Sequence, residues 1–203
     1  MKQGKGFMGD ALKLFIITLV AGVCLGAAYE LTKDPIALAK ADAAQKAYHT
    51  VFTEAASFDE NADAKAEIAG TKDQIAKDYS NARIVSVMDA RDASGKVVGH
   101  VINSTGKGFK GDVAITVGIK SDGTVTGIGF LSISESPGLG MEAEKPDFYG
   151  QYENKKVDKF TVTKTGAKQD SDINAISGAT ITSRAVTNAV NAALYFSKNC
   201  IKQ

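Results

Sequence analysis

Residues 177–194 read SGATITSRAVTNAVNAAL, and the rest of the chain is interpreted around this stretch. Its apolar residues recur at helical spacing, which predicts an amphipathic helix from Arg184 to about Lys198. The residues before that helix, Ser177 to Ser183, are small or carry hydroxyl groups, apart from Ile181. They therefore lie at or near a helix N-terminus, where unpaired backbone N–H groups and the helix dipole favour an anion.

The residues alone leave two interpretations of this helix start open. Serine and threonine are preferred N-caps, so a cap would account for one of the hydroxyls of Thr180, Thr182 and Ser183. Alternatively, Gly178 and Ala179 project no bulk and would let a phosphate group approach the backbone closely.

An antiparallel sheet is predicted before this helix. Residues 83–91 and 96–104 have strand composition and are separated by a turn. Residues 113–120 alternate between apolar and other side chains, and residues 125–133 return after a second turn, which predicts a hairpin. Strands followed by a segregated helix indicate the α+β class. We place this domain at residues 82–203, with helices flanking the sheet.

The chain has 203 residues, 23% of them charged, and a net charge of +1. This size suits one domain with an appendage, and the near-neutral balance gives no support for a nucleic-acid partner. We find no catalytic triad and no spacing of His, Cys, Asp and Glu that indicates a metal site. Any redox chemistry would therefore have to come from a cofactor.

Residues 11–29 read ALKLFIITLVAGVCLGAAY and carry a single charge, Lys13. Because about 20 apolar residues span a bilayer, we predict a transmembrane helix at residues 11–31, in contact with membrane lipid. Lys2, Lys5 and Lys13 outnumber Asp10 at its start, so residues 1–10 are expected to be cytoplasmic. The chain would cross the cell (inner) membrane once and place its main domain outside the cytoplasm. A cleaved signal peptide is the alternative.

Residues 32–81 are predicted to form a helical linker region. Pro35 suits the first turn of a helix that extends toward Phe58, and residues 58–80 are expected to be a peripheral helix or loop. We interpret His49 and His100 as packing or surface residues, not as ligands.

Two irregular stretches follow predicted strands. Residues 106–111 are a glycine-rich connection without the GxGxxG arrangement of a Rossmann fold. Residues 135–140 read ESPGLG, in which Pro137 and Gly138 suit a type II turn. For either stretch, an ordinary loop between secondary-structure elements is the alternative interpretation.

Together, Gly106-Lys107-Gly108-Phe109, residues 135–140 and Ser177-Gly178-Ala179-Thr180 resemble, in the same order, the motifs of a known family. It is the FMN-binding domain found in the G subunit of Rnf complexes and in the C subunit of sodium-pumping NADH:quinone oxidoreductases. The length of the domain suits the G subunit better. The chain departs from the family pattern at Asn174, where an acidic residue is common.

The resemblance implies that Thr180 carries FMN through a phosphoester, installed by a flavin transferase. The other implied cofactor-binding residues belong to the same three motifs: Ser177, Gly178, Ala179, Ile181, Thr182, Ser183, Glu135, Ser136, Pro137, Gly138, Leu139, Gly140, Gly108 and Phe109.

The resemblance also implies an electron-carrying subunit that is not a complete enzyme by itself. With other membrane subunits, it would move electrons between ferredoxin and NAD, coupled to Na⁺ or H⁺ translocation. Three alternatives stay open: the C subunit of a sodium-pumping enzyme, a membrane-anchored domain that binds a phosphate-bearing ligand reversibly, and a purely structural assembly subunit.

Overall fold

The computed structural model of the protein describes residues 4–201. Lys2 and the last two residues of the predicted domain therefore lie outside the described residues. The chain divides into two compact units, Met1–Ala43 and Ala44–Gln203.

The first unit consists of the greater part of helix α1, Gly4–Val51. By length and composition α1 is apolar enough to cross a membrane, and the apolar window that meets this criterion is not buried within the chain. The predicted segment 11–31 lies wholly inside α1. The expectation that a new helix begins at Pro35 is wrong, because Pro35 lies within this continuous helix. Proline lacks a backbone N–H, so the helix loses one hydrogen bond at that point without ending.

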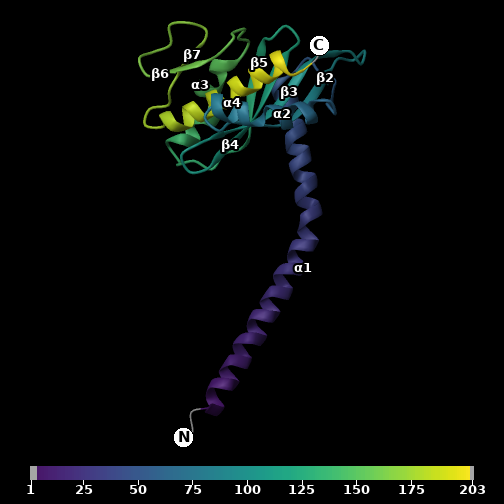
Figure 1. Cartoon of the computed structure of the whole chain (residues 1–203), viewed down its shortest axis with the longest axis vertical. Helices are drawn as coiled ribbons and strands as arrows, with labels where there is room; N and C mark the ends of the chain where they lie inside the picture. The colour runs from purple at the N-terminus through teal and green to yellow at the C-terminus, as the bar shows by residue number, and fades with distance from the viewer. Residues whose placement is uncertain (1–3, 202–203) are drawn as a thin grey trace. The chain divides into compact units, whose positions relative to one another are not determined.

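A five-stranded antiparallel sheet organises the second unit (Figure 1). Its order follows the sequence, and each strand pairs with the next one along the chain. The strands are β1 (Ser57–Glu60), β2 (Arg83–Arg91), β3 (Val97–Lys107), β4 (Asp112–Lys120) and β5 (Val125–Ser132). The α+β class and the four predicted strands are confirmed.

Two details of the sheet differ from expectation. Part of the segment expected to be a peripheral helix or loop is an edge strand, β1, and only its remainder forms helix α2 (Ala64–Asp78). Strand β3 runs through Gly106 to Lys107, so the connection to β4 is shorter than predicted. Pairing decides both cases: Ser57–Glu60 finds partners on β2, and Gly106 pairs with Val113.

Short elements connect the sheet to the last helix. They are the 3-10 helices η1 (Gly140–Glu144) and η2 (Gly150–Tyr152), the one-turn helix α3 (Pro146–Tyr149), and the parallel strands β6 (Thr161–Thr163) and β7 (Asp172–Asn174).

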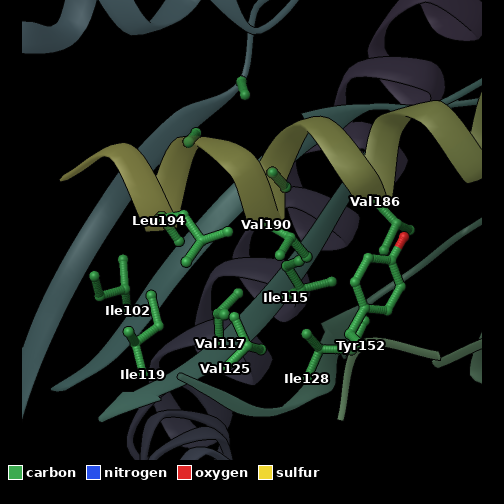
Figure 2. Close-up of a cluster of buried hydrophobic side chains, with 14 of the residues drawn as sticks. Ile102, Ile115, Val117, Ile119, Val125, Ile128, Tyr152, Val186, Val190 and Leu194 are labelled. Atoms are coloured by element: carbon green, nitrogen blue, oxygen red, sulfur yellow. The ribbon is translucent and has the colours of Figure 1, made fainter. Parts of the chain in front are cut away.

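Helix α4 (Thr180–Asn199) covers one face of the sheet and forms the main core with it. Figure 2 shows Val190 and Leu194 of α4 directed toward side chains of the strands, and Val186 beside Tyr152 of η2. On β4, the alternate residues Ile115 and Val117 are fully buried in this layer. Each such aliphatic side chain contributes about 1.5–3 kcal/mol when it leaves water.

The other face of the sheet packs against residues of the second unit that precede β1. Tyr48, Val51 and Phe52 form a separate buried cluster with Ala90 and Val101. Val101 belongs to this cluster, whereas its neighbour Ile102 belongs to the main core, because successive strand residues point to opposite faces.

Glycines make this second layer possible. A Cβ atom on Gly99 would lie 2.7 Å from the Phe52 ring, and one on Gly118 would lie 2.6 Å from the Val51 carbonyl oxygen. A larger residue at either position would push the end of α1 away from the sheet.

We predict that Phe52→Ala lowers the free energy of unfolding by about 3–5 kcal/mol, because it empties a fully buried aromatic position. Phe109→Ala is the matched control: Phe109 is 68% exposed, and its loss should change stability by only about 0.5 kcal/mol. Urea unfolding of the full-length protein in detergent measures both. Equal effects of the two substitutions would show that the second cluster does not stabilise the domain.

Candidate functional site

Three loops meet at the N-terminal end of α4, and the Glu135 carboxylate joins two of them to the helix. Glu135 is 6% exposed. Its Oε1 accepts hydrogen bonds from the backbone N–H groups of Phe109, at 2.9 Å, and Lys110, at 3.1 Å. Its Oε2 accepts one from the hydroxyl of Thr182, at 3.0 Å. The three sequence motifs, far apart in the chain, are therefore brought together.

Glycines allow this close approach. A Cβ atom on Gly108 would lie 2.4 Å from Glu135 Oε1, and one on Gly140 would lie 2.7 Å from Thr182 Oγ1. Gly178 has a φ of +74° and faces Leu139. This left-handed conformation is one that glycine adopts without steric cost.

The structure does not support the cap interpretation of the helix start. Helix α4 begins at Thr180, and its N-cap residue is Ala179, which makes no side-chain capping bond. The hydroxyl of Thr182 is bound to Glu135, and the hydroxyl of Ser183 donates to the carbonyl oxygen of Ala179. Ser183 Oγ also accepts the backbone N–H of Ile176, which fixes the preceding loop. These two hydroxyls therefore shape the loops and do not cap the first turn of the helix.

Thr180 differs from its neighbours. Thr182 and Ser183 are buried, whereas Thr180 is half-buried. Within residues 4–201 its hydroxyl makes no hydrogen bond, and the backbone N–H groups of Thr180, Ile181 and Thr182 have no acceptor. A reachable hydroxyl beside three free N–H donors at the positive end of a helix suits an anionic group such as phosphate.

Apolar side chains surround this helix start. Phe109 is 68% exposed, Leu139 44% and Ile181 53%; the first two belong to two of the loops, and Ile181 belongs to the first turn of α4. Beside them lies a cleft of about 380 Å³, lined by residues that include Gly138, Phe148 and Ser177. The site therefore combines an anion-binding helix end with apolar groups that could contact a flat ring.

The predicted residues have two kinds of place in this site. Thr182, Ser183, Glu135 and Gly140 are buried, and the first three are used in contacts within the protein. The others are exposed or half-buried around the helix start, apart from the buried N-cap Ala179: Ser177, Gly178, Thr180, Ile181, Ser136, Pro137, Gly138, Leu139, Gly108 and Phe109. Sequence reasoning missed Lys110 and Ile176, which take part through their backbone N–H groups. Such contacts leave no trace in residue type.

The histidines and acids elsewhere do not form a second site. His100 is buried, with Nδ1 3.1 Å from Asp89 Oδ1. Burial lowers the pKa of His100, and the Asp89 carboxylate opposes this shift. Among residues 4–201, no group of three His, Cys, Asp or Glu side chains is placed to hold a metal ion.

We predict that Glu135→Ala destabilises the domain by about 1.5–3 kcal/mol, because buried donors lose a charged acceptor. Amide hydrogen exchange at Phe109 and Lys110 should accelerate at the same time. Glu144→Ala, which removes an exposed carboxylate, is the control and should cost no more than about 0.5 kcal/mol. Unchanged exchange at both amides in Glu135→Ala would contradict the role of Glu135 as the link between the loops.

Comparison with known proteins assigns the chain to a family. Residues 108–195 match the family described as FMN-binding domain, and they include all three loops. Among solved structures, the chain resembles NqrC of Shewanella oneidensis, with 25% identity, a TM-score of 0.47 and 54% coverage of each chain. It also resembles the C subunit of the Na⁺-translocating NADH-quinone reductase of Parabacteroides distasonis, with 26% identity and a TM-score of 0.48 over 58% of this chain and 64% of that one.

Full-length relatives match almost the whole chain. The G subunit of the ion-translocating oxidoreductase complex of Methanosarcina acetivorans is 31% identical over 96% of both chains. The G subunit of the proton-translocating ferredoxin:NAD⁺ oxidoreductase complex of Clostridium ljungdahlii is 32% identical, over 89% of this chain and 86% of that one. The Na⁺-translocating counterpart of Acetobacterium woodii is 31% identical, over 94% and 91%. The chain therefore belongs to the G-subunit family of Rnf-type electron-transport complexes, and its residues 108–195 form an FMN-binding domain.

Proposed function

We propose that the protein carries FMN covalently, through a phosphoester to Thr180 Oγ, and passes electrons within an Rnf-type complex. The hydroxyl of Thr180 carries this proposal. Unlike the buried hydroxyls of Thr182 and Ser183, it is reachable and has no hydrogen-bond partner within residues 4–201. An ester at Thr180 would therefore break no contact that holds the loops together.

The surrounding residues suit the phosphate. The free N–H groups of Thr180, Ile181 and Thr182 would face its oxygens, and the helix dipole would favour its charge. Gly178 and Ala179 leave room for the group because neither projects a large side chain. Ser177 is exposed beside them and offers a further hydroxyl.

The flavin supplies one- and two-electron chemistry when it is bound. The protein would hold the flavin and leave its ring partly exposed. Phe109, Leu139 and Ile181 offer exposed apolar surface around the helix start, and the Pro137–Gly140 loop borders the cleft described above. A partly exposed ring could receive an electron from one subunit and deliver it to another.

The relatives indicate which complex this is. The names of two of them, from Clostridium ljungdahlii and Acetobacterium woodii, describe ferredoxin:NAD⁺ oxidoreductase complexes that translocate protons and Na⁺, respectively. We infer that this chain works in such a complex with other membrane subunits, and that a flavin transferase attaches the FMN. Because all three of these relatives are G subunits, an Rnf-type complex is favoured over a sodium-pumping NADH:quinone oxidoreductase.

Helix α1 supports a single-pass anchor in the cell (inner) membrane, in contact with lipid, because it is long and apolar enough to span the bilayer. Lys5 and Lys13 near its start favour a cytoplasmic N-terminus. The FMN domain would then lie on the extracytoplasmic side. There, a covalent bond prevents loss of the cofactor by dilution.

We predict that Thr180→Ala abolishes covalent flavin, whereas Ser177→Ala retains it. The wild-type protein should fluoresce as a flavoprotein on a denaturing gel, and its intact mass should include one FMN. Thr180→Ser keeps a hydroxyl and should accept some flavin. Covalent flavin detected on Thr180→Ala by either in-gel fluorescence or intact mass would contradict the assignment. Flavin released from the wild type by denaturation would instead indicate reversible binding, and a colourless wild type in an active complex would indicate a structural subunit.

We also predict that protease added to spheroplasts digests the FMN domain, while protease added to inverted vesicles does not. A C-terminal tag reports digestion, because it lies on the domain. A second tag at the N-terminus should persist in the mature protein and be cleaved only in inverted vesicles. Loss of the N-terminal tag during maturation would favour a cleaved signal peptide, and the opposite digestion pattern would reverse the orientation.

A further inference from the structure

Arg184 has no acidic partner in the described part of the chain, residues 4–201. The chain contains three arginines, and the other two are paired. Arg83 forms an ion pair with Asp112, and Arg91 contacts Asp59 at 2.9 Å and Asp89 at 3.5 Å. Arg184 is exposed, and its guanidinium takes part in no ion pair or hydrogen bond within these residues. Its charge is therefore available to a group from outside the chain.

The position of Arg184 does not stabilise the helix itself. It is the fifth residue of α4, just past the first turn, and the dipole at this end of the helix gives no stabilisation to a cation. The first turn of α4 contains no acidic residue that would offset it. Helix stability alone therefore does not account for an arginine here.

Helix geometry places Arg184 beside Thr180. Residues four apart lie on the same face, with Cβ atoms about 5–6 Å apart. Helical side chains also lean toward the N-terminus, so Arg184 extends over the turn that contains Thr180. Residues 180, 184 and 188 are all exposed or half-buried, while residues 182, 183, 185, 186 and 187 between them are buried. This stripe faces away from the core.

Nearby acids do not compete for the guanidinium. The Glu135 carboxylate is buried, and both of its oxygens accept hydrogen bonds within the protein. Glu142 lies 2.6 Å from Lys145 in an ion pair of its own. An anion held at the helix start would therefore be the natural counter-charge for Arg184.

We propose that Arg184 binds the phosphate of the flavin carried by Thr180, an inference that rests on the function proposed above. A phosphate esterified on both sides keeps one negative charge and two unesterified oxygens. The planar guanidinium presents two parallel N–H donors in a fixed geometry that matches both oxygens at once, whereas a lysine ammonium acts as a point charge on a flexible stem. Arg184 thus supplies charge neutralisation, while the free N–H groups of the first turn supply further donors.

The test is a cycle of four full-length proteins in detergent: wild type and Arg184→Gln, each with and without covalent flavin. Without flavin, Arg184→Gln should be at least as stable as wild type, because a cation leaves the helix N-terminus. With flavin, the wild type should gain about 1–4 °C more in Tm than the variant gains. Circular dichroism at 222 nm follows unfolding, and 1 M salt should reduce the difference.

Phosphorus NMR gives a readout that is independent of stability. The ³¹P resonance of the loaded protein should move in Arg184→Gln and return toward the wild-type position in Arg184→Lys, which keeps the charge. Lys72→Gln, which removes an exposed cation from α2, is the matched control and should change neither measurement. If Arg184→Gln lowers the Tm of the flavin-free protein, the Tm comparison is confounded by stability, and the ³¹P shift then tests whether Arg184 binds the phosphate.

An equal gain in Tm for wild type and Arg184→Gln, together with an unmoved ³¹P resonance, would overturn the proposal. That result is distinct from failure of the proposed function, in which the wild type would carry no flavin on a denaturing gel.

Discussion

The candidate site depends on one buried carboxylate. Glu135 binds two backbone N–H groups of the β3–β4 loop with one oxygen and the Thr182 hydroxyl of α4 with the other. A buried charge is costly unless hydrogen bonds satisfy it, and here three donors do so. This arrangement fixes the position of the helix start relative to two loops. It also commits Thr182 to the scaffold and leaves Thr180 as the available hydroxyl.

The sheet supports this arrangement because both of its faces are covered. Helix α4 packs on one face through aliphatic side chains, so its N-terminus is held at the edge of a rigid layer. The cluster around Phe52 covers the other face. The glycines of the strands and loops serve the same end, since they let backbone and side chains approach where a Cβ atom would collide.

Neighbouring hydroxyl groups at the start of α4 differ in burial and in hydrogen bonding. Thr180, Thr182 and Ser183 are chemically alike and lie within four residues. Burial and hydrogen bonding give Thr182 and Ser183 structural roles, whereas the half-buried Thr180 hydroxyl has no hydrogen-bond partner within residues 4–201. A cofactor bound through Thr180 would sit at the positive end of α4, with apolar side chains from two loops and from the first turn of the helix around it. The residues at the start of α4 would then both retain the flavin and leave it partly exposed.

The sequence by itself determined the elements whose signals are local. Alternation of apolar residues in 113–120, helical spacing after Arg184 and the apolar run at 11–29 predicted β4, α4 and the membrane-length part of α1, because side-chain period follows backbone geometry. The three motifs also identified the family, since their residues are contiguous. Only the tertiary structure decided that β1 joins the sheet, that Pro35 lies inside a helix, and that Glu135 joins loops instead of simply lining them. These outcomes depend on strand pairing, on helix continuity and on backbone donors that are distant in the chain. None of these can be predicted from the types of the neighbouring residues in the sequence.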